Sequence, residues 1–287
     1  MPTTVASGFL KFKQNLEITD LQASVVSTRQ RNIREAVEGE LAVLDSFLAG
    51  SYMRDTLISP LKTADIDVFV VLDPKYWTAD GQANLLDRVK RLLKKSYPNS
   101  PEVSRNGQAV TITFTDFKVD VVPCFYRKDG GYLIPDSHRN QWISTDPLKH
   151  ITLWTESNKW HAGNLVPLLK MMKAWNKNRN IMPSFALEVA VYKALQNITI
   201  SDLPSAIRYA FDKMRVSVKS KIADPSGYSD DVAADVTMGA KMDTVVSALE
   251  TAYTRAKAAE EYASRGNIEA AFERWRLIFG DYFPSYG

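Results

Sequence analysis

Two aspartates separated by a single residue, Asp65 and Asp67, open an apolar segment over residues 68–72. On a strand, residues i and i+2 project to the same face, so the two carboxylates are expected side by side, with Ile66 turned toward the core. Two carboxylates this close repel each other unless they are protonated or bridged by cations. The pattern therefore indicates a site that gathers negative charge at the edge of a core.

A third aspartate, Asp120, lies inside a second apolar strand pattern over residues 117–122. Neighbouring strands lie about 4.8 Å apart, so Asp120 joins Asp65 and Asp67 if the two strands pair. Three carboxylates are hard oxygen ligands suited to Mg²⁺, with phosphate oxygens completing its shell. Two such ions, Mg²⁺ or alternatively Mn²⁺, can stabilise the attacking and leaving oxygens of phosphoryl transfer. The position of Asp120 suits activation of an attacking hydroxyl.

A Gly50-Ser51 pair precedes the acid pair, with Asp65 fourteen residues after Ser51. Glycine allows close backbone approach, and a serine that opens a short helix offers its hydroxyl and neighbouring N–H groups to a phosphate. A Gly-Ser pair alone is a common turn, so its value rests on the spacing to the acids. The alternative, three solvated surface acids, is less favoured because of this turn and the apolar flanks of Asp120.

The elements around these residues change character along the chain. The patterns predict a helix over 20–40, strands over 42–48, 64–72, 109–114 and 117–122, a helix over 84–97 and a loop over 130–150. Helices are predicted over 165–176, 184–196, 203–218, 242–265 and 268–279. We therefore expect an α/β (α+β) fold with a mixed-sheet lobe over residues 1–160 and a helical lobe over 161–287. The ligand site is expected in the cleft between the lobes.

Composition excludes several classes of protein. Of 287 residues, 45% are hydrophobic and 24% charged, with a net charge of +3, which is unlike disordered, collagen-like or coiled-coil chains. A single cysteine excludes an internal disulfide and a cysteine-built zinc site, and it fits the reducing cytoplasm. The five-residue apolar run over 68–72 is far short of the roughly 20 residues that span a bilayer, so no membrane association is expected.

The segments GSYMRDTLISPLKTADIDVFVVL and FKVDVVP together resemble the nucleotidyltransferases of the DNA polymerase β type. The order LLKMMKAWNK, PSFALEVAVY, DPSG and WRLIFGDYFP narrows the resemblance to the bacterial CD-NTases, relatives of cyclic GMP-AMP synthase and oligoadenylate synthetase. The resemblance implies a polymerase β-like nucleotidyltransferase lobe beside a helical lobe. It also implies an enzyme that joins nucleoside triphosphates into a cyclic di- or trinucleotide, a second messenger of phage infection for a downstream effector.

The resemblance implies a substrate class, and two alternative functions remain beside it. The substrates would be ATP, GTP or both, with pyrimidine triphosphates as alternatives. A linear-product nucleotidyltransferase of the same fold, acting on an RNA end or a protein, is the alternative enzyme. A non-catalytic binding module is the alternative of another class, and the intact acid triad argues against it.

The resemblance also carries over site residues. It makes the three aspartates the metal-binding triad, Gly50 and Ser51 the phosphate-contacting motif, Lys170 a contact of the donor triphosphate, Ser184 a phosphate contact and Phe185 a base-stacking ring. Residue type and position alone indicate less specific roles for Lys170, Ser184 and Phe185. A lysine rarely lies buried without a partner, so Lys170 is expected to face the cleft or solvent, with Lys173 as a second candidate. Ser184 after Pro183 predicts an N-cap, and Phe185 suits the core equally well.

Two expectations concern partners. Pro284 ends the last helix, so the tail is expected to be extended and accessible, and the resemblance implies that a conjugation enzyme could join the Gly287 carboxylate to a target amine. An ordinary disordered tail is the alternative. Nucleic acid is not expected as a partner, because a basic helix face is usually just solvated. That face carries Arg88, Lys90, Arg91, Lys94 and Lys95. The chain also lacks the Cys/His zinc insertion of the DNA-sensing relative that the resemblance brings in.

Overall fold

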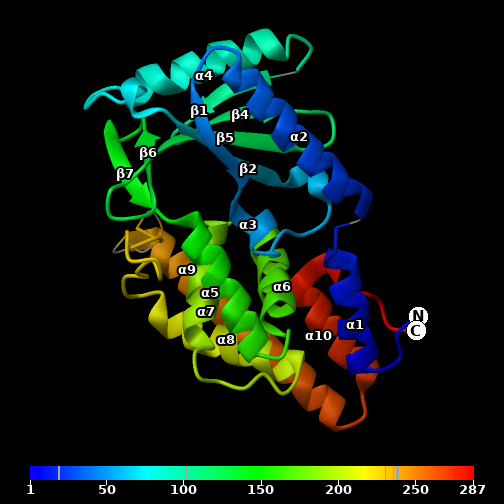
Figure 1. The fold of residues 1–287 in the computed structure, drawn as a ribbon. Coiled ribbons are helices and arrows are strands. Elements are labelled where there is room, and N and C mark those ends of the chain that lie inside the picture. The colour runs from blue at the N-terminus through cyan, green and yellow to red at the C-terminus, as the bar shows by residue number, and fades with distance from the viewer. Residues whose placement is uncertain (19, 101, 230, 235, 237–238) are drawn as a thin grey trace. The chain divides into compact units, whose positions relative to one another are not determined.

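The structure is a computed structural model that describes residues 1–18, 20–100, 102–229, 231–234, 236 and 239–287. Its contacts group the chain into two units, shown in Figure 1. The sheet unit is Ile18–Leu153, and the helical unit combines Met1–Glu17 with Trp154–Gly287. The sequence predicted one division between residues 160 and 161. The structure differs mainly at the N-terminus, whose first 17 residues pack with the helical unit.

Among the described residues, seven strands form the mixed sheet of the sheet unit. Its main path runs β1 (Val43–Leu48), β2 (Asp65–Leu72), β5 (Lys118–Tyr126), β4 (Ala109–Thr113) and β3 (Glu102–Asn106). β2 and β5 are parallel, whereas the other neighbours on this path are antiparallel. The hairpin of β6 (Tyr132–Asp136) and β7 (Gln141–Thr145) continues from β5 (Figure 1).

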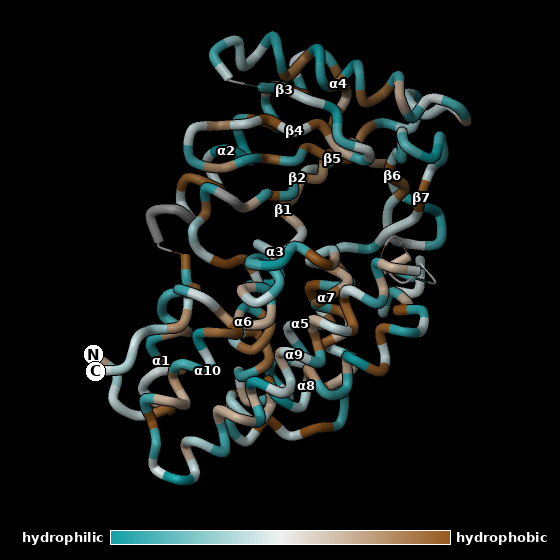
Figure 2. The backbone as a smooth tube through the Cα atoms, turned by 180° about the vertical axis from the view of Figure 1, so that it is seen from behind, coloured by the Kyte–Doolittle hydropathy of each residue, from teal (hydrophilic) through white to brown (hydrophobic). Residues whose placement is uncertain are grey.

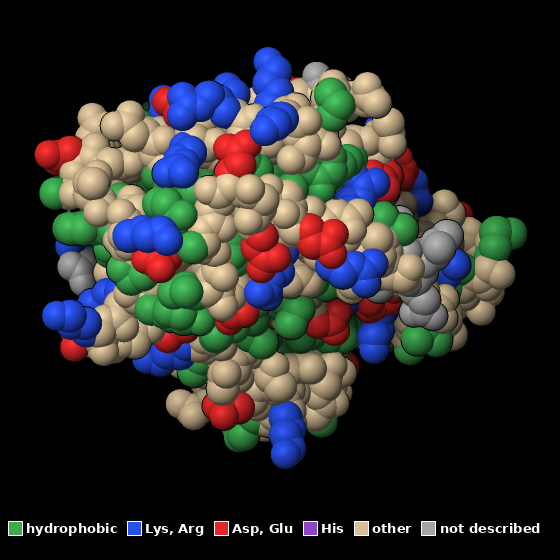
Figure 3. All heavy atoms as spheres, turned by 45° about the horizontal axis from the view of Figure 1, so that its top comes forward, with side chains coloured by type: hydrophobic (Ala, Val, Ile, Leu, Met, Phe, Trp, Pro, Cys, Tyr) green, Lys and Arg blue, Asp and Glu red, His purple; other side chains and the backbone are tan. Residues whose placement is uncertain are grey.

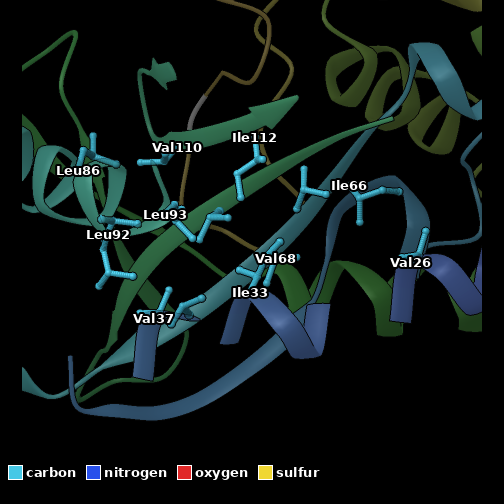
Figure 4. Packing of buried hydrophobic residues seen from close by; sticks show 14 of the residues in the cluster. Val26, Ile33, Val37, Ile66, Val68, Leu86, Leu92, Leu93, Val110 and Ile112 are labelled. Carbon is cyan, nitrogen blue, oxygen red and sulfur yellow. The ribbon is translucent and has the colours of Figure 1, made fainter. Parts of the chain in front are cut away.

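Helices α2 (Asp20–Glu38) and α4 (Gln82–Ser96) cover one face of this sheet. Figure 4 shows Ile33 and Val37 of α2 and Leu93 of α4 packed toward Val68 of β2. Each fully buried aliphatic side chain of this kind contributes about 1.5–3 kcal/mol to folding. The alternation along β2 places Ile66 and Val68 in this core and turns Asp65 and Asp67 to the opposite face.

The helical unit contains α1 (Val5–Leu16), α6 (Leu165–Lys177), α7 (Ser184–Ala194), α8 (Leu203–Ser217), α9 (Gly239–Ser264) and α10 (Ile268–Phe279). The predicted helices from 165 onward are confirmed to within a few residues. Residues Leu165 to Asn176 of α6 are all buried, so this helix forms the centre of the unit. No helix in the described part of the chain has an apolar stretch long enough to cross a bilayer.

The N-terminal helix α1, for which the sequence analysis gave no prediction, docks through aromatic side chains. Phe9 packs edge-on against Trp275 at 5.0 Å between ring centroids, and Phe12 lies 4.7 Å from Phe279. The glycine at position 8 permits this contact, since a Cβ there would lie 2.6 Å from the Phe272 ring. The Gly287 N–H donates to the Pro2 carbonyl at 3.3 Å, and Figure 2 shows the two ends of the chain side by side.

The expected loop over residues 130–150 is wrong. The segment holds β6, β7 and the start of α5 (Pro147–Trp160). Gly130 and Gly131 form the turn into β6, and Pro135 lies within that strand. β5 also runs to Tyr126, past the predicted end at Pro123. β4 pairs with β5 over residues 118–121, so the proline lies beyond that pairing, where a strand tolerates a missing N–H.

Charged side chains of both signs intermingle on the face drawn in Figure 3. Lys95 of the basic α4 face lies 2.9 Å from the Glu40 carboxylate, and Asp87 of α4 pairs with Arg105 at 3.3 Å. Exposed pairs of this kind contribute at most about 1 kcal/mol each. Of the basic side chains of α4, Lys95 thus lies beside an acidic one.

The docking of α1 predicts the effect of truncating its buried ring. Phe12→Ala should lower the free energy of unfolding by about 3–5 kcal/mol, because Phe12 is fully buried in the aromatic cluster. Leu10→Ala is the matched control on the same helix, since Leu10 is 59% exposed, and it should change stability by less than about 0.5 kcal/mol. Guanidinium unfolding followed by tryptophan fluorescence measures both. Equal effects of the two substitutions would contradict the docking.

Candidate active site

Asp67, Asp120 and Thr111 form a row across three adjacent strands. In the parallel pairing of β2 with β5, Asp67 lies opposite Asp120, and in the antiparallel pairing of β4 with β5, Thr111 lies opposite Asp120. Asp65 precedes Asp67 by two residues on the same face and lies opposite Lys118. The two strands on which the triad depends are therefore paired and in register. The three aspartates Asp65, Asp67 and Asp120 are together called the carboxylate row below.

The surroundings of Asp120 disfavour its charged form. Burial raises the pKa of its carboxyl above the usual value, and the negative charge of Asp65 raises it further. The Thr111 hydroxyl opposes this by donating to Oδ1 of Asp120 at 2.5 Å, and the Lys118 ammonium also lowers the pKa. A carboxylate in this position is stabilised further by any cation that approaches it.

Gly50 lies directly against the carboxylate of Asp67. Its φ is +62°, and a Cβ at this position would lie 1.7 Å from Oδ2 of Asp67. The Ala49 N–H donates to the Asp67 carbonyl at 2.9 Å, which ties the end of β1 to β2. Ser51 follows in the short helix α3 (Gly50–Met53) and is half-buried. The turn that the sequence singled out thus places Gly50 against Asp67 of the acid pair.

The donor chemistry of the carboxylate row fits a hard divalent cation, since carboxylate oxygens are the ligands that Mg²⁺ prefers. Within the described residues, however, no group of three His, Cys, Asp or Glu side chains is close enough together to hold an ion. Neighbouring carboxylates repel one another, and one oxygen of Asp120 is held by Thr111. The strands therefore align the aspartates, and a cation would draw their side chains together.

Two lysines of α6 are buried in the helical unit, contrary to the expectation that Lys170 faces a cleft or solvent. The Lys170 side chain is 2% exposed, and its Nζ lies 2.6 Å from Oε2 of Glu17, at the C-terminal end of α1. Lys173 Nζ lies 3.1 Å from Oε1 of Glu188, which is fully buried on α7. The carboxylates make burial of the ammonium groups tolerable. Neither pair was predicted from the sequence.

Ser184 and Phe185 begin α7. Pro183 is the N-cap and receives no side-chain cap bond, so the predicted N-cap role of Ser184 is wrong by one residue. Ser184 is exposed. Phe185 is half-buried and stacks on Trp154 at 6.3 Å between centroids.

Trp154 extends this stack to Tyr192, with 5.0 Å between centroids and 13° between the ring planes. Sequence analysis missed both rings. Tyr192 could have been found, since it follows Phe185 by seven residues and thus shares its helix face. Trp154 lies in α5, a helix that the sequence analysis did not predict.

Comparisons with known proteins show which family and fold the chain resembles. The family model described as Second Messenger Oligonucleotide or Dinucleotide Synthetase domain matches residues 3–158. A cyclic AMP-AMP-AMP synthase of Acinetobacter sp. (strain ATCC 27244 / 9458) is 26% identical, covering 98% of this chain and 86% of the relative.

Two solved structures share the fold. E. coli MS115-1 CdnC with ATP has a TM-score of 0.78 at 19% identity, covering 98% of this chain and 99% of that one. Vibrio cholerae di-nucleotide cyclase (DncV), as a mutant in complex with ATP, GTP and 5MTHFGLU2, has a TM-score of 0.79 at 15% identity, covering 99% and 98%. At these identities the likeness shows the fold, including the mixed sheet that carries the carboxylate row.

The raised pKa of Asp120 predicts that replacing its carboxyl by an amide raises the melting temperature, by an amount that depends on pH. Asp120→Asn keeps an oxygen that can accept from Thr111 but carries no charge, so the metal-free variant should melt at a higher temperature than the wild type at neutral pH. The pKa of Asp120 is higher in the folded than in the unfolded state. The wild type therefore loses folding stability as the pH rises from the unfolded-state pKa to the folded-state pKa. The advantage should therefore shrink as pH falls toward 4. Calorimetry in EDTA at several pH values measures it, and a pH-independent difference would contradict the assignment.

Proposed function

Because the chain belongs to the Second Messenger Oligonucleotide or Dinucleotide Synthetase family, the CD-NTases, we propose that its carboxylate row performs the metal-assisted step of that synthesis. The chain is a nucleotidyltransferase that makes cyclic oligonucleotides from nucleoside triphosphates. The observation that carries the site assignment is the register of β2 with β5, which sets Asp67 beside Asp120, while Gly50 lies against Asp67.

The family depends on divalent metal, and the proposed ligands are Asp65, Asp67 and Asp120. Two Mg²⁺ ions would supply charge neutralisation at the reacting phosphate and a lowered pKa of the attacking hydroxyl. The three aspartates would hold these ions from one face of the sheet. Gly50 is the proposed point of close backbone approach to the triphosphate, and its missing side chain leaves room for the Asp67 carboxylate. Ser51, which follows Gly50, is the proposed hydrogen-bond donor to a phosphate oxygen.

The helical unit supplies the proposed contacts to the rest of the nucleotide. Lys170 is assigned to the donor triphosphate, Ser184 to a phosphate oxygen and Phe185 to the base. The exposure of the Ser184 hydroxyl and the partial exposure of the Phe185 ring support these roles. The phosphates would compete with Glu17 for the Lys170 ammonium.

ATP and GTP are the proposed substrates. The relative named a cyclic AMP-AMP-AMP synthase supports adenine nucleotides, and the solved CdnC and DncV structures contain ATP. The product is proposed to act as a messenger of phage infection. Conjugation at Gly287 also stays a proposal, supported by the exposure of residues 285–287 beyond the buried anchor Phe283.

The carboxylate row predicts which aspartate is essential. With labelled ATP and GTP, Mg²⁺ and phosphatase, the wild type should yield a small phosphatase-resistant product, because every phosphate of a cyclic product is internal. Asp67→Asn should lower product formation more than about 100-fold, beyond the 10–100-fold typical of outer-shell partners. Asp129→Asn is the matched control, an exposed aspartate of the β5–β6 turn, and should retain activity.

Two outcomes of this assay would contradict the proposal. A product that phosphatase degrades completely would favour the linear-product alternative. Wild-type activity of Asp67→Asn with Mg²⁺ would refute the metal assignment.

The Lys170 assignment predicts a change in substrate binding. Lys170→Met preserves the volume of the buried stem and should raise the Michaelis constant for the triphosphate about 10- to 100-fold. This range corresponds to the roughly 1.5–3 kcal/mol of a hydrogen bond to a charged group. Glu17→Gln, which neutralises the other member of the pair, should not raise it. Steady-state kinetics with a melting curve for each variant measure this, and an unchanged constant in Lys170→Met would make the lysine structural.

A further inference from the structure

Thr111 lies beside the proposed metal ligands without belonging to them. It occupies the middle of β4, is 7% exposed and lies opposite Asp120 in the β4–β5 pairing. Its Oγ1 lies 2.5 Å from Oδ1 of Asp120, and the hydroxyl is the donor. A buried hydroxyl costs free energy unless it is hydrogen-bonded. The neighbouring buried positions of β4, at Val110 and Ile112, are apolar.

We infer that Thr111 is a positioning residue that orients the Asp120 carboxylate for the cation. The hydroxyl holds Oδ1, which fixes the rotation of the carboxylate and leaves Oδ2 to ligate the metal. Carboxylates that ligate metals are commonly held by such outer-shell donors. This inference rests on the proposed function, because it needs the carboxylate row to bind a cation.

The fold itself does not require the hydroxyl. β4 and β5 are already joined by a ladder in which Val110 lies opposite Val121 and Ile112 opposite Val119. Valine has nearly the shape of threonine and suits a buried strand position at least as well. A hydroxyl at this position is therefore explained by its bond to Asp120 rather than by the packing of β4.

The test compares Thr111→Val, which removes the hydroxyl, with Thr111→Ser, which keeps it. Thr113→Val is the matched control on the same strand and face, opposite Lys118. Mn²⁺ affinity is measured by electron paramagnetic resonance on the full chain with a non-hydrolysable ATP analogue. Product formation is measured in parallel against Mn²⁺ concentration. Thr111→Val should weaken Mn²⁺ binding about 10- to 100-fold, while Thr111→Ser and Thr113→Val stay within about threefold of the wild type.

The Michaelis constant for the triphosphate at saturating Mn²⁺ should stay near its wild-type value in Thr111→Val, because the hydroxyl acts on the metal ligand. Should Thr111→Val fail to fold, Thr111→Ala compared with Thr111→Ser isolates the same oxygen atom. Equal Mn²⁺ affinity in those two variants, or wild-type affinity in Thr111→Val, overturns the inference. So does a wild type that binds no Mn²⁺.

Failure of the Thr111 role and failure of the proposed function give different experimental results. A wild type that makes cyclic product while Thr111→Val keeps full Mn²⁺ affinity removes the role of Thr111 and leaves the proposed function standing. The wild type could instead make no cyclic product while Thr111→Val still weakens Mn²⁺ binding. That result supports Thr111 as a positioning residue and rejects the proposed product.

Discussion

The parallel, in-register pairing of β2 and β5 is the constraint on which the candidate site depends. It sets Asp67 beside Asp120, an arrangement that repulsion between carboxylates disfavours. A slip of one residue would turn Asp120 to the other face and expose its neighbours. Val119 and Val121 flank Asp120 and pack in the core covered by α2 and α4, so burial of these side chains maintains the register. The hydrophobic core thus offsets the repulsion at the site.

Two small features adapt the sheet to its carboxylates. At Asp67 the feature is the missing side chain of Gly50, because a Cβ at that position would lie 1.7 Å from Oδ2 of Asp67. At Asp120 it is an added hydroxyl, since Thr111 donates to Oδ1. Gly50 leaves room for the Asp67 carboxylate, and Thr111 holds one oxygen of the Asp120 carboxylate. Both come from segments that neighbour β2 or β5 in space, so the site combines four separate segments of the chain.

Local patterns in the sequence predicted the part of the site that depends on local geometry. The i, i+2 spacing of Asp65 and Asp67 on a strand holds as predicted, and the helices from 165 onward follow their apolar periodicity. The position of Asp120 required the assumption that two strands pair. Thr111 was missed, because a threonine in an apolar strand is ordinary unless its cross-strand neighbour is known. The helix α1 depends on tertiary contacts of Phe9 and Phe12, which local sequence does not show.

The buried lysines show the same limit and its consequence for function. Glu17 lies 153 residues before Lys170, so no spacing rule connects them. Once the pairs are known, their surroundings separate the two lysines. Glu188 is fully buried and pairs with Lys173, and breaking a buried ion pair by removing one partner typically costs about 3–5 kcal/mol. Glu17 is 44% exposed and can be solvated by water when it releases Lys170. This difference supports the proposal that Lys170, rather than Lys173, exchanges its carboxylate for a phosphate, while the Lys173–Glu188 pair joins α6 to α7.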